Sequence, residues 1–328
     1  MKTTKEAVIK ATSDLADEKG LNNVSLKAVA QKLNIRTPSL YNHIESLDNL
    51  LLEVAHNGMR DMNERMMKIA VGKIGKEAIK LVSIEYLNYM IEIIENEADL
   101  SSWDVDDIYS VRIFSLLKSY GTKYNFAKFY RQVIDGKITA VISSLDNNLT
   151  LALNDGFDNE EIVRFLCVNG YSTLLCDERL VLSSRFEEGD VMVCSSKFDA
   201  SFTDAVVDEY PKLMDLYNFI DYEGQDFKAW YVDISHRVRH KTAKAYTLKS
   251  NETIIASGIL SSIYHDNAVL TAVQTMPEYR NMGYGSALVS YICSDVSKNV
   301  YIMREQGRNE NFYSRLGFKN IGKWRMYK

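Results

Sequence analysis

The segment Arg280–Gly285, "RNMGYG", contains the residue types of a loop that holds phosphate groups. Gly283 and Gly285 have no side chain to keep an anion away from the backbone N–H groups. A helix predicted to begin near Ser286 would add partial positive charge from its N-terminus. Arg280 supplies a further positive charge beside it. The segment therefore predicts a cradle for a pyrophosphate group.

Two other phosphate-binding motifs do not fit this segment. A dinucleotide-binding loop needs a third glycine and an acidic residue about 20 positions further on, whereas here Tyr291 and Ile292 continue an apolar face. A nucleotide-binding P-loop ends in Gly-Lys-Ser/Thr, which this segment lacks. Two glycines alone more often form a left-handed turn. The neighbouring elements must therefore decide between a turn and a cradle.

A second group of reactive side chains lies on the helix predicted over residues 225–240. Asp233 and His236 are three positions apart, and His236 and His240 are four apart, so each pair shares a helix face. Asp233 and His236 are candidates to accept the proton of an amine or to bind an acidic acceptor. A structural salt-bridge network is the preferred alternative. A third metal ligand is not identifiable, so no metal is predicted.

The elements around the glycine loop alternate in a recognisable order. Two helices are predicted over residues 206–220 and 225–240, followed by strands over 243–250, 253–264 and 268–276. The loop and its helix come next, then a strand at 300–305, a short helix in "NENFYSRLGF" and a last strand near 322–328. The loop therefore follows a strand and opens a helix, which favours the cradle.

This order and these residues resemble the GNAT superfamily of N-acetyltransferases over roughly residues 205–328. Arg280–Gly285 resembles the family's Gln/Arg-x-x-Gly-x-Gly/Ala loop, and Tyr313 stands four residues before Gly317-Phe318, as a family tyrosine does. The resemblance implies acetyl-CoA as co-substrate and Tyr313 as the general acid that protonates the leaving thiolate. It implies a cofactor site made of Val273, Gln274, Thr275, Arg280, Asn281, Met282, Gly283, Tyr284, Gly285, Ser286, Asn309 and Phe312. Glu310 departs from the small residue often found there.

Residues 97–200 show part of the same order without a glycine loop. "KITAVISSLDNNLTLALN" predicts a β-hairpin, residues 158–170 a helix that ends at Gly170, and residues 171–177 a strand. The segment is similar to the partner half of tandem acetyltransferases. We expect a degenerate copy that packs against the active half.

The N-terminal segment "SLKAVAQKLNIRTPSLYNHI" predicts a helix capped by Ser25, a tight turn and a second short helix capped by Thr37. Ala28, Val29, Leu33, Leu40 and Ile44 form the expected small core. In such a helix-turn-helix the second helix enters the DNA major groove, and lysine and arginine side chains contact phosphates. The candidate DNA-binding residues are Lys27, Lys32, Arg36, Thr37, Ser39, Tyr41, Asn42 and His43.

From Ala7 to Leu52 the chain resembles the DNA-binding domain of TetR-family repressors, through "VSL", "VA", "SLYNH" and the leucines that follow. The resemblance implies binding to double-stranded operator DNA as a homodimer, and it fades after about Met90. A plain three-helix bundle used only for dimerisation is the alternative. Nearby acidic residues nearly balance the lysines, so weak non-specific attraction to DNA is expected.

The 328-residue chain carries a net charge of −5, which argues against a protein that coats nucleic acid. It has no run of about 18 apolar residues, so no membrane span is predicted, and its start does not resemble a signal peptide. The four cysteines are scattered, so no disulfide framework is expected. These features predict a cytoplasmic protein.

The predicted fold class is multidomain: an all-α helix-turn-helix domain followed by α+β GNAT-like mixed-sheet domains. The predicted divisions are 1–50 for DNA binding, 51–96 as a helical connector, 97–200 as the degenerate copy and 201–328 as the acetyltransferase. The predicted function is an acetyl-CoA-dependent N-acetyltransferase, acting on a small-molecule or peptide amine, joined to a DNA-binding regulator domain. The alternative is a regulator whose GNAT-like region senses acyl-CoA without catalysis.

Overall fold

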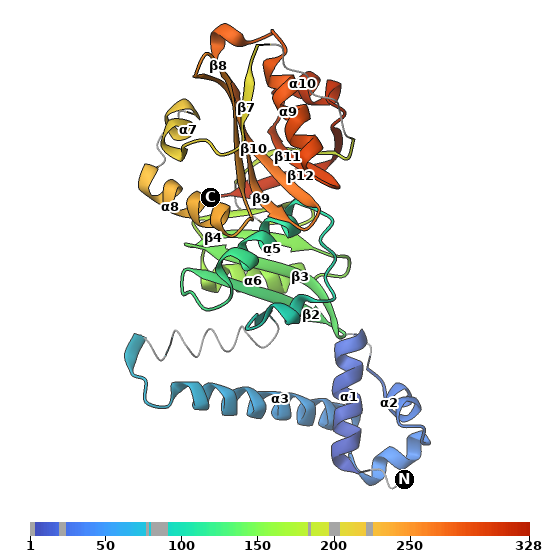
Figure 1. Cartoon of the computed structure of the whole chain (residues 1–328). Helices are drawn as coiled ribbons and strands as arrows, with labels where there is room; N and C mark the ends of the chain where they lie inside the picture. Colours follow the sequence, from blue (N-terminus) through green and yellow to red (C-terminus); the bar gives the residue numbers. More distant parts are fainter. Residues whose placement is uncertain are drawn as a thin grey trace. The chain divides into compact units, whose positions relative to one another are not determined.

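The computed structural model describes residues 4–19, 24–76, 79, 91–182, 185–196, 204–220 and 226–328. The chain divides into two compact units, Met1–Tyr89 and Met90–Lys328 (Figure 1). The finer divisions predicted at residues 50, 96 and 200 stay predictions.

The first unit is helical in its described part. It contains α1 (Lys5–Lys19), α2 (Leu26–Lys32), the 3₁₀ helix η2 (Thr37–Asn42) and α3 (Leu47–Ala70). The hydroxyls of Ser25 and Ser46 cap α2 and α3 by accepting from Ala28 N and Asn49 N. Val29, Leu40 and Ile44 are buried as predicted, with Ala28 and Leu33 packed against them.

Two predictions about this unit are wrong in detail. Thr37 is the first residue of η2 rather than its cap, because Arg36 occupies the N-cap position without a side-chain hydrogen bond. The connector predicted as helical over residues 51–96 is not helical to its end, because Ile91–Ile93 form strand β1, which pairs with β2. Residues 77, 78 and 80–90 of the connector lie outside the described residues.

The second unit is built on one sheet of twelve strands in the order β1-β2-β3-β4-β5-β12-β6-β11-β10-β9-β8-β7. Its first half contains β1 (Ile91–Ile93), η3 (Glu97–Leu100), α5 (Ile108–Tyr120), β2 (Ala127–Ile134), β3 (Lys137–Leu145), β4 (Asn148–Leu153), α6 (Asn159–Asn169), β5 (Thr173–Asp177) and β6 (Phe186–Cys194). Its second half contains β7 (Val206–Asp208), α7 (Leu213–Ile220), α8 (Phe227–Arg239), β8 (Lys244–Ser250), β9 (Thr253–Tyr264), β10 (Asn267–Thr275), η4 (Pro277–Tyr279), α9 (Tyr284–Asp295), β11 (Asn299–Glu305), α10 (Glu310–Arg315) and β12 (Lys319–Tyr327).

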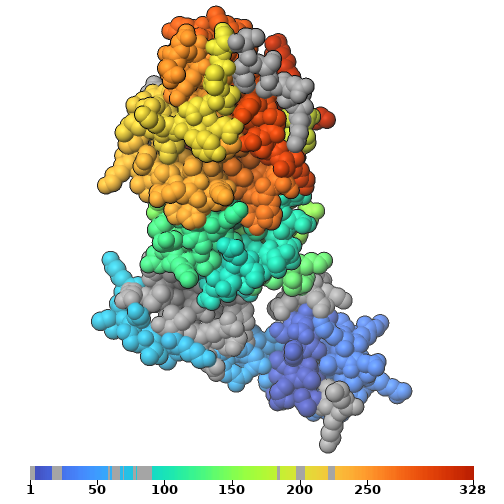
Figure 2. All heavy atoms as spheres, viewed as in Figure 1, coloured from blue at the N-terminus to red at the C-terminus, as the bar shows by residue number. Residues whose placement is uncertain are grey.

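The two halves exchange a strand. β12, from the second half, pairs with β5 of the first half, while β6, from the first half, pairs with β11 of the second half. β6 and β12 also pair with each other along their whole lengths. The atoms of the two halves are accordingly in continuous contact in the space-filling view (Figure 2). Neither half completes its part of the sheet with its own strands.

The hairpin β3–β4 forms as predicted, because Asp146 and Asn147 adopt positive φ angles of 47° and 64°, as a two-residue type I′ turn requires. The strands predicted over residues 243–305 and the helix α8 also form where expected. Residues 206–220 are only partly helical, since Val206–Asp208 form strand β7 and α7 begins at Leu213. Helix α5 and strands β2 and β6 were not predicted.

Helix α5 is the central packing element. Ten of its thirteen residues are buried, and it contacts β3 and β4 of the first half as well as β9 and β10 of the second. Burying so many apolar side chains between the halves joins them into one core. Among the described residues, no helix combines the length and apolar composition needed to cross a membrane.

Candidate active site

The site begins where β10 and β11 separate. Their parallel pairing covers Asn267–Val269 against Asn299–Tyr301 and stops there among the described strands. The register of β10 with β9 also shifts between Thr271 and Gln274, where Ala272 has a φ of 53°. Such a bulge bends a strand and re-aims its backbone. The segment Val273–Thr275 therefore borders an opening in the sheet.

Helix α9 presents an uncapped N-terminus beside this opening. Its N-cap residue, Gly283, has a φ of 90° and makes no side-chain cap, and its first turn has no acidic residue. The first intrahelical bond at this end is from Ala287 N to Gly283 O, at 2.9 Å. The N–H groups of Tyr284, Gly285 and Ser286 are therefore left for an anion.

Gly285 joins the three parts of the site. A Cβ at Gly285 would lie 2.6 Å from Thr275 Oγ1 and 3.9 Å from the Phe312 ring. The helix end, the edge of β10 and α10 thus meet around one glycine. Arg280 donates from Nε to Thr275 O at 3.0 Å, which ties the loop to β10. Asn281 and Met282 are exposed beside it.

Tyr313 lies on α10, half-buried between the rings of Phe312 and Phe318, with centroid distances of 5.0 and 5.4 Å. Burial, and to a lesser degree the Cys293 thiol, raises the pKa of Tyr313 to about 12. The phenol is therefore protonated at neutral pH, the state that a proton donor needs. Asn309, the exposed N-cap of α10, has a φ of 57°.

Glu310, where the sequence departs from the family pattern, has a definite contact. Its carboxylate lies 3.5 Å from Arg304 Nη2. Arg304 is only 6% exposed, pairs with Asp190 of β6, and donates to Arg308 O at 3.0 Å. The loop that carries Asn309 is therefore held by Arg304, whose own partner Asp190 comes from the other half. No sequence motif had indicated either residue.

Asp233 and His236 belong to a polar network between α8 and α5. Asp233 Oδ1 accepts from Tyr120 Oη at 2.6 Å and from Arg237 Nε at 2.8 Å. His236 Nε2 donates to Ser119 O at 2.9 Å, and its ring stacks on Tyr120. Among the described residues, no contact joins Asp233 or His236 to Tyr313. Their role as a general base stays a prediction.

The first half lacks a comparable anion site at its helix α6. The Asp158 carboxylate caps α6 by accepting from Glu161 N at 3.1 Å, and Glu160 and Glu161 follow in the first turn. These charges repel an anion. β4 and β5 pair only at Asn148–Thr150 and Thr173–Leu175.

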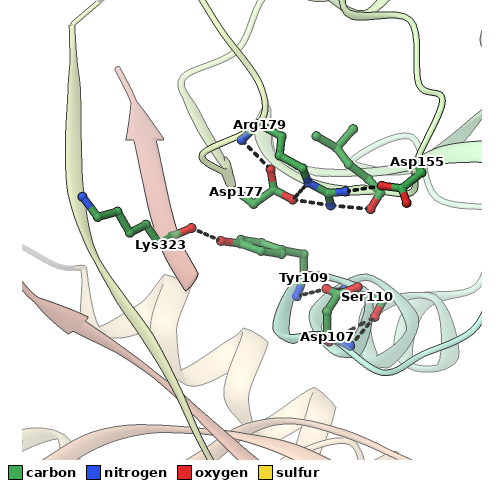
Figure 3. A network of polar contacts seen from close by, with 8 residues as sticks. Asp107, Tyr109, Ser110, Asp155, Asp177, Arg179 and Lys323 are labelled. Carbon is green, nitrogen blue, oxygen red and sulfur yellow. Dashed lines mark hydrogen bonds and ion pairs between the residues drawn. The ribbon is translucent and has the colours of Figure 1, made fainter. Parts of the chain in front are cut away.

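Beyond that point a side chain bridges the ends of β4 and β5. Arg179 Nη2 donates to Leu153 O and to Asp177 Oδ2, both at 2.6 Å (Figure 3). The place that corresponds to the opening between β10 and β11 is therefore occupied by Arg179.

The candidate DNA-binding residues lie on α2, on η2 and in the turn between them, where Asn34 has a φ of 52°. Tyr41 is 56% exposed. Thr37 and His43 are half-buried, and the exposed members of the set are Lys27, Lys32, Arg36, Ser39, Tyr41 and Asn42. The exposed side chains of α2 and η2 in this set are polar or basic.

Comparison with known proteins defines the class of the second half. Residues 204–318 match the family model described as Acetyltransferase (GNAT) family. The match identifies a GNAT acetyltransferase domain over these residues.

A solved Drosophila protein shares the fold with a TM-score of 0.50 at 12% identity, covering 73% of this chain and 98% of that one. The shared fold therefore extends well beyond residues 204–318.

The curated relatives concern a shorter part of the chain. An uncharacterized HTH-type transcriptional regulator of Bacillus subtilis, YobS, is 34% identical over 89 residues, 27% of this chain and 47% of its own length. Another of that description from Mycobacterium tuberculosis, Rv0681, is 25% identical over 88 residues, 27% of this chain and 40% of its own. The chain spans about half the length of the curated relatives it matches, or less. Assignment to the TetR family stays a prediction.

The residues that no motif indicated act between elements distant in sequence. They include Asp190, Arg304 and Arg179, together with Arg112 and Tyr120 of α5. Their surroundings are set by the strand exchange and by the position of α5. Among the described residues, no group of three or more histidine, cysteine or acidic side chains is placed to hold a metal ion, and the four cysteines are free.

Proposed function

We propose that the protein is an acetyl-CoA-dependent N-acetyltransferase joined to a DNA-binding helical domain. The observation that carries the enzymatic part is the contrast between two helix N-termini. α9 begins at an uncapped glycine beside an opening in the sheet, and α6 begins at an aspartate cap followed by glutamates. Only the first suits a pyrophosphate.

The residues around the opening have separate roles in this proposal. The N–H groups of residues 284–286 and the Arg280 side chain bind the pyrophosphate, while the loop Asn281–Gly283 leaves space for it. The backbone of Val273, Gln274 and Thr275 pairs with the pantetheine arm, and Asn309 and Phe312 line its channel. Acetyl-CoA supplies the thioester. The acceptor amine attacks the acetyl carbonyl, which a backbone N–H of the bulged segment polarises, and a C–N bond forms as the C–S bond breaks. Tyr313 gives its proton to the departing thiolate, and the proton that the amine loses passes through solvent and restores the phenol.

Asp233 and His236 position the acceptor side of the site in this proposal. Both Asp233 oxygens contact the Arg237 guanidinium on the same helix, and Asp233 Oδ1 also accepts from Tyr120 of α5, so the carboxylate ties α8 to α5. The acceptor is a small-molecule or peptide amine.

For the N-terminal domain we propose binding to double-stranded operator DNA as a homodimer, with η2 in the major groove. Support comes from the exposed polar surface of η2 and from the relatives' names as HTH-type regulators. Both activities place the protein in the cytoplasm.

The test is isothermal titration of the full chain with acetyl-CoA and with CoA, repeated on Gly283→Glu. Gly156→Glu is a matched control, since Gly156 precedes α6, has a φ of 85°, and like Gly283 has open space around its Cβ position. We expect micromolar binding that Gly283→Glu abolishes and Gly156→Glu leaves unchanged. Equal loss in both variants, or no binding to the intact chain, would contradict the assignment of the pyrophosphate site.

A second candidate is a transcription regulator that senses acyl-CoA without turnover, which the names of the curated relatives favour. Tyr313→Phe separates the two. A sensor keeps its CoA response and DNA binding and has no turnover to lose, whereas an enzyme loses turnover.

A further inference from the structure

Arg112 of α5 is a half-buried cation that has no partner among the described residues. Its Nε is enclosed and unbonded, and no hydrogen bond or ion pair reaches the guanidinium. Burial, followed by repulsion from Arg237, lowers the pKa of Arg112 to about 10, so the group stays charged at neutral pH. Since buried charges in folded proteins are normally paired, this one requires an explanation.

The surroundings of Arg112 place it between the two halves. It lies seven residues before Ser119, hence on the same face of α5, and Ser119 O accepts from His236 of α8. Toward the N-terminal end of α5, three residues before Arg112, Tyr109 Oη donates to Lys323 O at 3.0 Å (Figure 3). Lys323 stands opposite Asp190, which stands opposite Arg304 near the end of β11.

Arg237 connects the surroundings of Arg112 to strand β9 and, through it, to β10. It donates from Nη1 to Ser261 O in β9, next to Leu260 and Ser262, which pair with β10. Arg112, whose charge is felt by both Tyr109 and Arg237, therefore lies over the region where β10 and β11 separate. α5 packs with Val269 and Tyr301 there, whereas α9 packs with Leu270 and Ile302 on the opposite face. Arg112 therefore lies across the sheet from α9, the helix whose N-terminus binds the pyrophosphate in the proposed function.

The charges around Arg112 leave one positive charge uncompensated. Asp233 pairs with Arg237 at 2.8 Å and also attracts Arg112, but in the part of the chain that the structure describes no carboxylate lies within ion-pair distance of the Arg112 guanidinium. A single excess positive charge matches a monoanion, and a guanidinium binds a carboxylate with two parallel hydrogen bonds.

We propose that Arg112 binds a carboxylate of the acetyl acceptor, so that the substrate is an amine that also carries a carboxylate, such as an amino acid. This inference rests on the proposed function, because it names the substrate class of the same site. Arg112 is thereby a specificity-determining residue contributed by the first half of the second unit.

The first experiment measures binding and needs no turnover. N-acetylated amino acids covering the twenty side chains, and their carboxamides, are titrated into the full chain with and without CoA. We expect at least one acid to bind about 10- to 100-fold more tightly than its amide, as for a lost hydrogen bond to a charged group. Arg112→Met removes that ratio and Arg112→Lys restores part of it. Arg164→Met, an exposed arginine paired only with Glu160, leaves the ratio unchanged.

The second experiment measures thermal unfolding. Because Arg112 is unpaired without ligand, Arg112→Met is expected to raise Tm by about 2–4 °C. A carboxylate ligand is expected to raise the Tm of the wild-type chain and to leave that of the variant unchanged.

Three results would overturn the proposal: no acid binding better than its amide, an acid preference unaffected in Arg112→Met, or a clear fall in Tm in that variant. The last would mean that the charge is structural. If CoA does not bind but the acid preference and its loss in Arg112→Met are observed, the proposed function fails and the carboxylate site stands.

Discussion

Gly285 and Thr275 approach so closely that a Cβ on the glycine would lie 2.6 Å from the threonine Oγ1. Real Cβ atoms do not tolerate this distance, so the first turn of α9 can adjoin β10 only while position 285 is glycine. The contact fixes where the helix N-terminus points.

Gly285→Ala is therefore expected to weaken acetyl-CoA binding by about 10-fold, the effect of a misplaced helix end worth about 1.4 kcal/mol. Thr275→Ala removes the clashing Oγ1, so the double variant should recover most of the affinity. Isothermal titration of acetyl-CoA into the wild type, the two single variants and the double variant measures the coupling energy between positions 275 and 285. Additive losses in the double variant would show that the contact does not set the position of the helix.

Tyr313→Phe is expected to lower kcat by about 10²- to 10⁴-fold while the Kd for acetyl-CoA stays unchanged, since it removes only a proton donor. The raised pKa of Tyr313, about 12, means that deprotonation of this phenol does not reduce kcat between pH 7 and 10. Because the pKa of Tyr313 is higher in the folded chain than in the unfolded chain, its protonation contributes to the free energy of unfolding. This contribution is fully present below pH 10 and is lost as pH rises through about 12. Steady-state rates across this range check the activity part. A one-proton decline below pH 10 that the phenylalanine variant abolishes would be inconsistent with it.

Asp190→Asn leaves the buried Arg304 without its charged partner from β6. Removing one member of a buried ion pair typically costs about 3–5 kcal/mol of unfolding free energy. Urea unfolding measures it, with Arg308→Gln as the control because the pair of Arg308 with Glu305 is exposed and should contribute about 0–1 kcal/mol. Equal effects of the two substitutions would count against a buried pair.

Asp233→Asn distinguishes a structural network from a general base. As a structural residue, Asp233 ties α8 to α5 through Tyr120 and orients Arg237 within α8. We expect a lower Tm, a loss in kcat/KM below about 10-fold, and an unchanged acid limb of the pH–rate profile. A loss above about 100-fold at unchanged Tm would instead identify Asp233 as the base.

For the N-terminal unit, sequences selected by the full chain from random DNA provide the probe. Lys27→Ala should weaken binding to selected and unselected DNA alike and reduce the salt slope by about 1. Tyr41→Ala should mainly reduce the preference for the selected sequence. Lys68→Ala, at the far end of α3, is the control. Failure to enrich any sequence would support a helical unit that serves only in dimerisation.

The sequence predicted local features well where the signal is local. The glycine loop, the Asp146–Asn147 turn and the strands β8 to β12 are encoded by periodicity and turn residues, and they form as expected. Helix α5 escaped prediction because nearly all its faces are apolar and buried, which removes the helical periodicity. The end of the connector predicted as helical over 51–96 forms β1, because pairing with β2 outweighs local helix propensity.

The contacts between the two halves could not be predicted from the sequence for a different reason. Arg112 and Arg237, or Asp190 and Arg304, become neighbours only through the order of the strands in the sheet. A single sequence contains no signal for that order, because a register is decided by pairing partners that lie far along the chain.

The exchange of β6 and β12 also sets the order in which the second unit can be completed during synthesis. Strand β5 cannot complete its pairing until β12 has been synthesised. Tyr327 Oη of β12 also donates to Leu180 O, which lies 147 positions earlier in the chain. Until residues 319–327 emerge from the ribosome, the edge of β5 and one edge of β6 stay unpaired, and such edges are prone to aggregate. Folding of the enzymatic unit is therefore expected to finish only after translation of both halves. A nascent chain that stops short of β12 depends on chaperones to remain soluble.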